Sequence, residues 1–460
     1  MYEFAVSIRG LQRTDFIQLP IKKGDLMNIL YLEHYAGSPD MGMEFRPYYL
    51  SREWIRQGHR VSIVAGDFSH LRKKNPRIRE DMTLKNIDGI DYYWLRTGAY
   101  EGNGVERALT MLRFCGKLNK YRQRICELTH PDVVISSSTY PIDSMAAQRI
   151  VRYADKTRSK WDRGDDITEH GFIPKKTIHI HEVHDMWPST LIELGGMSKT
   201  NPFVVMMQRG ENYAYSHADA VVSLPGHAED YMLKHGLRKG CFFHIPNGVV
   251  TEEWDDPEPL PEEHSKVLRQ LKDDGKFIVG YFGGHALSNC LGTLVEAARI
   301  LDCDDKSQVH FVLVGDGVEK KKLTESAKGL KNITFLPPVP KRAVPSLTDC
   351  FDCIYIGAMD SPLYRFGVCM NKMFDGMMAG KPIIFAINAP TTPVEECDCG
   401  LMIKPEDEDE IITAVKRLMD MSPSERRKMG ERGRRRILDR YTYGKLAEDF
   451  IKIVEDKEKK

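Results

Sequence analysis

Two short apolar runs enclose a loop and a helix in the last quarter of the chain, and this order strongly constrains the fold. Residues 353–356 and 382–385 predict buried strands, and residues 371–379 predict a helix between them. Strand, helix and strand in this order are typical of a parallel sheet, whose ligands bind at the carboxyl ends of the strands. The helix would direct its free N–H groups at residues 360–370, which makes that loop a candidate anion site.

The charged side chains of this stretch suit a nucleoside diphosphate. Arg365 and Lys372 lie on either side of the predicted helix start at Asn371 and could bind phosphate. Asp375 follows one turn inside the helix, where a carboxylate can accept hydrogen bonds from ribose hydroxyl groups. The stretch therefore predicts a nucleotide site.

Composition excludes several other classes of protein. The 66 basic and 66 acidic side chains among 460 residues cancel, which argues against a general nucleic-acid-binding surface. Ten irregularly spaced cysteines favour a reducing compartment, and we expect a cytoplasmic protein. Cys350 and Cys353, with Cys397 and Cys399, would form a poor zinc site because the first pair enters a predicted buried strand, so we expect no metal. No apolar run approaches the roughly 18 residues that span a membrane.

The strand and helix pattern begins twice, which predicts two domains. Residues 27–245 predict a first parallel α/β domain, residues 246–275 an acidic, proline-rich linker, and residues 276–438 a second domain. Residues 1–26 fit neither pattern. We expect either that translation starts at Met27 or that these residues form a disordered extension.

A histidine-rich strand supplies a second candidate cluster. His179, His181 and Glu182 lie in a predicted strand that ends at His184, near the same sheet edge as Asp185. Because strand side chains alternate, Glu182 and His184 should lie on the face opposite to the other two histidines. Structural or cleft-lining roles are therefore favoured over a metal cluster.

Glycine-bearing loops follow two predicted strands of the second domain. Gly283, Gly284 and His285 follow one strand, and Gly315 ends the next. Glycines allow backbone N–H groups to approach a phosphate, so these loops are candidate donor sites. Gly37 lies in the corresponding loop after the first strand of the first domain.

The motifs resemble a known family. Asp375-Gly-Met-Met-Ala-Gly-Lys-Pro is similar to the Glu-Ala-Met-Ala-Ala-Gly-x-Pro end of the Glu-x7-Glu motif in retaining glycosyltransferases of family 4, which have the GT-B fold. Asp375 would replace the second Glu, and the first Glu would fall on Gly367. Tyr-Arg-Phe-Gly-Val-x-x-Asn-Lys-Met-Phe-Asp is similar to bacterial surface-polysaccharide enzymes that transfer N-acetylated amino sugars such as N-acetyl-fucosamine. Ile-Pro-Asn-Gly-Val, at residues 245–249, resembles the crossing between the two domains.

This resemblance implies an α/β GT-B fold in which two Rossmann-like, doubly wound parallel-sheet domains face a cleft. Residues 439–460 would form a helix that crosses back to the first domain. The residues that the resemblance implies as catalytic are His184, which orients the sugar, Asp185, which faces the acceptor, and Arg365 and Lys372 at the leaving diphosphate. The implied donor-binding residues are Gly283, Gly284, His285, Gly315, Val339, Asn371 and Asp375, and the acceptor-side candidates are Gly37 and Glu193.

The implied reaction is transfer of a sugar from a nucleotide-diphosphate donor, with an N-acetylated amino sugar on UDP as the first expectation. The acceptor would be a surface polysaccharide or a polyprenyl-linked saccharide, and transfer would retain configuration without a metal or other cofactor. A nucleotide-sugar 2-epimerase and a non-catalytic nucleotide-sugar-binding partner remain alternatives. Residues 102–127 mix basic and apolar side chains, which predicts either a surface helix packed on the core or a contact with anionic lipid at the inner face of a membrane.

Overall fold

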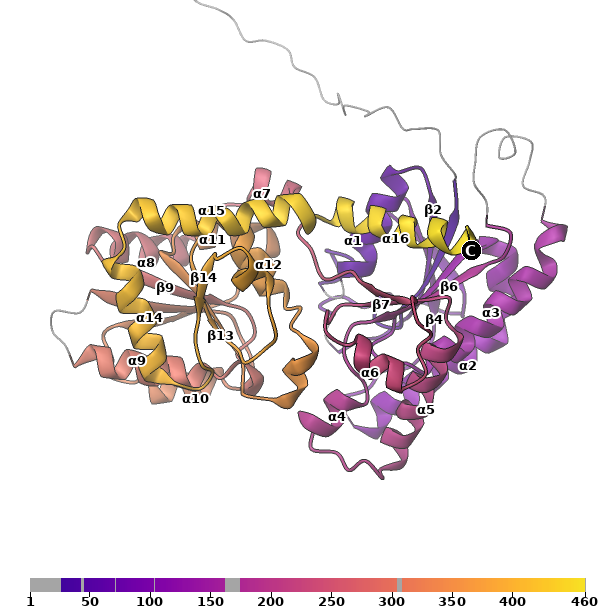
Figure 1. The fold of residues 1–460 in the computed structure, drawn as a ribbon, viewed down its shortest axis with the longest axis horizontal. Helices are drawn as coiled ribbons and strands as arrows, with labels where there is room; N and C mark the ends of the chain where they lie inside the picture. The colour runs from indigo at the N-terminus through magenta and orange to yellow at the C-terminus, as the bar shows by residue number, and fades with distance from the viewer. Residues whose placement is uncertain are drawn as a thin grey trace, which may run out of the picture.

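The computed structural model describes residues 26–42, 45–70, 72–102, 104–161, 174–303 and 308–459. They form two α/β domains that lie side by side, with the first domain on the right of Figure 1. The predicted class, two parallel-sheet α/β domains, is confirmed. The expectations for the N-terminal extension fall almost wholly outside the described residues.

An eight-stranded sheet forms the first domain, in the order β3-β4-β2-β1-β5-β6-β7-β8. All pairs are parallel except the hairpin of β3 and β4. The strand order reverses beside β1, and ligand clefts of such sheets lie at the carboxyl ends of the strands near this reversal. The strands are β1 (Asn28–Leu32), β2 (Arg60–Gly66), β3 (Thr83–Ile87), β4 (Ile90–Leu95), β5 (Val133–Ser136), β6 (Ile178–Val183), β7 (Ala220–Ser223) and β8 (Phe242–His244).

Helices cover both faces of this sheet. Ile29 and Tyr31 of β1 enter one hydrophobic core, whereas Leu30 and Leu32 enter another, as the alternation of a strand buried on both faces requires. The helices are α1 (Phe45–Arg56), α2 (Val105–Thr129), α3 (Asp143–Thr157), α4 (Ser189–Glu193), α5 (Pro202–His217) and α6 (Glu229–Lys234).

The second domain has a six-stranded parallel sheet in the order β11-β10-β9-β12-β13-β14, which reverses beside β9. Its strands are β9 (Phe277–Phe282), β10 (Val309–Val314), β11 (Ile333–Leu336), β12 (Cys353–Gly357), β13 (Ile383–Ala386) and β14 (Gly400–Met402). Its helices are α8 (Glu262–Asp273), α9 (Leu291–Asp302), α10 (Lys320–Ser326), α11 (Val344–Asp349), α12 (Asn371–Met378), α13 (Pro393–Glu396), α14 (Glu408–Asp420) and α15 (Pro423–Arg440), with 3-10 turns η3 (Leu287–Asn289), η4 (Lys341–Ala343) and η5 (Pro362–Phe366).

The chain crosses between the domains twice. The first crossing follows β8, and the segment predicted as a linker contains α7 (Glu252–Asp255) and α8, whose Leu268 and Leu271 enter the second core. The second crossing joins α15 to α16 (Tyr443–Glu458), and Figure 1 shows these two helices in yellow running from one domain to the other. Phe450 of α16 lies in the core beside α1, and Trp54 Nε1 of α1 donates to the Ala447 carbonyl at 3.1 Å.

Candidate functional site

A cavity of about 370 Å³ lies between the two domains. His184 and Asp185, which directly follow β6, line its first-domain side, and Asn371 at the start of α12 lines the other side. The structure therefore brings these three predicted site residues together. Gly367, the position of the missing Glu, also lines the cavity.

Lys372, in the first turn of α12, lies against the loop that follows β9. Its Nζ is 3.3 Å from the Tyr281 hydroxyl group and also donates to Asn289 Oδ1. Burial lowers the Lys372 pKa to about 8. Within the described ranges no carboxylate forms a salt bridge with this ammonium group, so a partly buried cation stands at a helix N-terminus without a counter-ion. Such a position favours a bound anion.

Residues 283–290, the loop after β9, contain no lysine or arginine, so a cation beside this loop must come from another element. Asn289 contacts Lys372 from the opposite side of the loop, so α12 supplies the cation to this place. The two residues are 83 positions apart in the chain.

The glycine loops after β9 and β10 touch closely. A Cβ on Gly315, whose φ is +154°, would lie 1.9 Å from the Gly283 carbonyl oxygen. A Cβ on Gly317 would lie 2.5 Å from the His285 carbonyl oxygen. The close approach of the two loops therefore requires glycine. Gly284 is exposed, and its carbonyl oxygen accepts a hydrogen bond from Tyr281 at 2.7 Å.

The His285 ring is fully buried between the rings of Tyr281 and Phe335. Burial lowers its pKa, so the ring is neutral near pH 7. Neither ring nitrogen has a hydrogen-bond partner among the described residues. Buried polar atoms without partners are rare, and these two nitrogens lie beside a predicted donor loop.

Asp375 lies in the middle of α12 and is paired. Its carboxylate oxygens are 2.7 and 2.6 Å from Lys341 Nζ, and only 9% of its side chain is exposed. Lys341 was not predicted as a site residue. It directly follows the proline-rich loop after β11, which contains Val339, and its closeness in the sequence to this predicted donor residue was the signal that could have identified it.

On the first-domain side, His184 Nε2 is 2.8 Å from Ser137 Oγ and 3.2 Å from Glu182 Oε2. His179 and His181 both contact Ser136 instead. The two pairs thus use opposite faces of β6, as the strand period predicts. No group of three or more potential metal ligands occurs in the part of the chain that the structure describes.

Arg365 and Glu193, predicted on opposite sides of the reaction, bind each other. Arg365 of η5 forms a bidentate ion pair with Glu193 of α4 at 2.7 and 2.8 Å, across the two domains. Neither residue lines the cavity. Gly37 also lies outside it, and its carbonyl oxygen accepts from Tyr92 at 2.8 Å.

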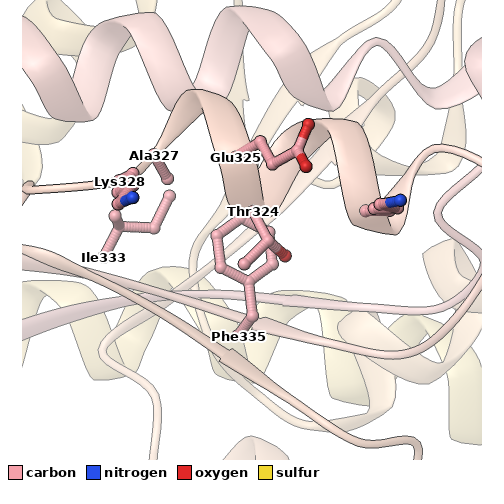
Figure 2. Close-up of a pocket in the computed structure, with 7 residues that line it drawn as sticks. Thr324, Glu325, Ala327, Lys328, Ile333 and Phe335 are labelled. Carbon is pink, nitrogen blue, oxygen red and sulfur yellow. The ribbon is translucent and has the colours of Figure 1, made fainter.

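A second cavity, of about 550 Å³, lies between α10 and the edge strand β11 (Figure 2). Thr324 and Glu325 of α10 and Ile333 and Phe335 of β11 line it. None of the predicted site residues does, so this cavity is separate from the one between the domains.

Comparisons with known proteins cover both domains. Residues 41–248 match a family model described as a glycosyl transferase 4-like domain, and residues 276–421 match one described as glycosyl transferases group 1. A probable glycosyltransferase of Pseudomonas aeruginosa, WbjE, is 22% identical over 207 residues, which is 44% of this chain and 49% of that protein. The chain thus spans about half the length of this relative.

Solved structures are similar over nearly the whole chain. Sucrose-phosphate synthase from Thermosynechococcus elongatus matches with a TM-score of 0.67 and 15% identity, covering 93% of this chain and 98% of that one. Anabaena HepE, solved in complex with UDP and glucose, matches with a TM-score of 0.60 and 15% identity, covering 93% and 99%. At these identities the likeness shows the fold.

Proposed function

Because the chain belongs to the GT-B glycosyltransferases, as the matches to both of its domains show, we propose that it transfers a sugar from a nucleotide-diphosphate donor to an acceptor across the interdomain cavity. The observation that carries this proposal is Lys372, a cation at the start of α12 that has no counter-ion among the described residues. A diphosphate supplies the missing negative charge.

In the proposed reaction the bond between the anomeric carbon and the diphosphate oxygen breaks, and the acceptor oxygen bonds to that carbon on the same face. The acceptor hydroxyl proton passes to the departing diphosphate, so no protein base and no metal are needed. Lys372, the first N–H groups of α12 and the loops at Gly283 and Gly315 stabilise the charge that develops on the leaving oxygens. Arg365 contributes only after it exchanges Glu193 for the diphosphate.

The remaining site residues orient the two substrates. Asp375, which pairs with Lys341, accepts hydrogen bonds from the ribose. The ring nitrogens of His285, which have no partner among the described residues, are available to the donor beside the glycine loops. His184, fixed by Ser137 and Glu182, orients the sugar, and the exposed Asp185 faces the acceptor.

We further propose UDP as the nucleotide and an N-acetylated amino sugar as the transferred group, with a surface polysaccharide or polyprenyl-linked saccharide as acceptor. The support is the similarity of residues 364–375 to surface-polysaccharide enzymes and the UDP and glucose bound by HepE.

A panel of nucleotide sugars tests this proposal. Incubation with each donor, with and without EDTA, should give slow UDP release from one N-acetylated donor, unaffected by EDTA and accelerated by the matching acceptor. Chromatography of the nucleotide and the sugar reports both products. An epimerised donor in place of free UDP would establish the 2-epimerase instead. Donor binding without any reaction, even after membrane extract is added, would support the non-catalytic nucleotide-sugar-binding alternative.

Helix α2 supports a contact with lipid. Met111, Phe114 and Leu118 are buried in the core, which accounts for one side of the helix. Val105, Leu109 and Leu112 lie on another side, at spacings of four and three, and are 76%, 44% and 43% exposed. No helix in the described residues is long and apolar enough to cross a membrane. We propose that this strip contacts an anionic membrane surface.

The double variant Leu109→Glu and Leu112→Glu should abolish co-flotation with vesicles that contain anionic lipid, because charged side chains oppose burial in the headgroup region. Leu128→Glu is the control, since Leu128 is 48% exposed on the same helix but outside the strip. Equal flotation of all three proteins would exclude α2 as the contact.

A further inference from the structure

Arg46 is a buried guanidinium group in the first turn of α1. Only 4% of it is exposed, and basic side chains are disfavoured near a helix N-terminus because the helix dipole is positive there. Its Nε donates to Glu182 Oε1 at 2.9 Å. Its two terminal nitrogens donate to the backbone carbonyls of Pro246 and Ile245 at 2.5 and 2.8 Å. Arg46 therefore joins β6 to the first crossing between the domains.

Glu182 connects this arginine to the candidate catalytic histidine. Its second oxygen lies 3.2 Å from His184 Nε2 and accepts from Ser137 Oγ at 2.6 Å and from the Tyr31 hydroxyl group. Burial alone would raise the Glu182 pKa, but the charge of Arg46 and the hydrogen bonds from His184 and Ser137 hold it well below its ordinary value. Glu182 is thus ionised and fully engaged.

The contacts continue into the second domain. Asn247, the residue after the anchored carbonyls, donates its backbone N–H to Cys369 Sγ at 3.0 Å and its side-chain amide to the Cys369 carbonyl at 2.9 Å. Cys369 lies in the loop that leads into α12 and lines the cavity. An unbroken series of contacts therefore runs from His184 through Glu182, Arg46 and the crossing to the start of the donor helix.

Stability alone gives little reason for this arrangement. Two buried charges lose their hydration, and apolar residues of similar size often stabilise a protein as well as a buried ion pair does. A guanidinium group with three directed donors instead defines geometry. By holding the carbonyls of Ile245 and Pro246 on the first domain, Arg46 places the pivot of any domain movement after Pro246.

We propose that Arg46 is a positioning residue that sets His184 against the donor by tying β6 to the interdomain crossing. This inference rests on the proposed function, because it assigns Arg46 a role in that transfer. The donor-binding residues proposed above all lie in the second domain, so Arg46 should affect turnover rather than donor affinity.

Arg46→Lys tests this directly. Lysine keeps the charge, but one ammonium group cannot reproduce the planar fork that reaches a carboxylate and two carbonyls. We expect kcat to fall about 10- to 100-fold, as misplacement by about 1 Å does. The Kd of UDP should stay within about twofold, which a general loss of structure would not allow. Glu182→Gln, of equal size, should show the same split if the lysine variant folds poorly.

Arg158→Lys is a matched control. Arg158 also pairs with a buried carboxylate, Asp132 at 2.9 Å, and donates to the Pro131 and Pro174 carbonyls. This pair lies at the amino end of β5, at the end of the strands away from His184. It should leave both kcat and UDP affinity unchanged. Wild-type turnover in Arg46→Lys, or an equal loss of kcat and UDP affinity, would overturn the inference while the proposed function stands.

Hydrogen exchange separates the two proposals. Residues 242–249 should exchange faster in Arg46→Lys and not in Arg158→Lys, whether or not a donor is known. If the wild-type protein turns over no donor, the proposed function fails, and this exchange alone decides the coupling. Unchanged exchange in Arg46→Lys would then refute it.

Discussion

Replacement of Lys372 by Met should lower kcat about 100- to 1,000-fold, the usual effect of removing one group that stabilises transition-state charge. Methionine preserves the length of the side chain and its packing beside Tyr281 but removes the positive charge at the start of α12. UDP should also bind more weakly, because the diphosphate loses the same cation. Single-turnover rates and UDP titration measure the two effects.

Lys381→Met provides the control. Lys381 lies just beyond the other end of α12, is also partly buried, and donates to the Asp349 carbonyl at 3.0 Å. The same substitution there should leave turnover unchanged. A Lys372→Met enzyme with wild-type kcat would remove Lys372 from the mechanism.

The pH dependence of UDP binding supplies a second readout for Lys372. Its pKa of about 8 means that the free protein loses this charge as the pH rises through 8. A diphosphate favours the charged form, so the Kd of UDP should rise about tenfold per pH unit as the pH increases above the pKa. Lys372→Arg, which stays charged, should show no such rise. Equal profiles for the two proteins would assign the titration to another group.

Gly315→Ala should abolish measurable UDP binding and destabilise the protein. The added Cβ would lie 1.9 Å from the Gly283 carbonyl oxygen and 3.3 Å from His285 Nε2, so the two donor loops must separate. The contact is with backbone, which cannot rotate away as a side chain can. Forced overpacking of this kind costs about 1–3 kcal/mol and moves backbone.

Gly292→Ala is the matched control. Gly292 lies in α9, which follows the same donor loop, and a Cβ there would meet no atom within 4 Å. Alanine in a helix is favoured over glycine by about 1 kcal/mol, so this variant should be slightly more stable and bind UDP normally. Thermal unfolding and UDP titration report both variants. Normal UDP affinity in Gly315→Ala would show that the donor does not need the two loops in contact.

Some of the cleft was predictable because it depends on local pattern. Parallel strands expose their carboxyl ends at one edge, so residues that directly follow predicted strands were expected to meet there. His184, Asp185 and Asn371 do line one cavity. The face that His184 shares with Glu182 followed from the two-residue period of β6.

The partners of the charged groups were not predictable in this way. Arg365 was expected to be free to bind phosphate, yet it binds Glu193, which is 172 positions away and in the other domain. Asp375 was expected to have a carboxylate free to bind ribose, yet this carboxylate binds Lys341. The burial of Arg46 could not be predicted from the sequence, because an arginine in an amphipathic helix is normally exposed to solvent.

The strands, helices and glycine turns of this protein could be predicted from its sequence, since they follow from the periodicity and chemistry of neighbouring residues. Those properties predicted two parallel α/β domains and the edge at which ligands bind. Which charged groups form ion pairs could be seen only in the folded chain, because an ion pair between distant residues depends on strand order and on the angle between domains. Lys372 therefore contacts the loop after β9 with no counter-ion in the part of the chain that the structure describes, and Arg46 holds the interdomain crossing, for reasons that no local pattern contains.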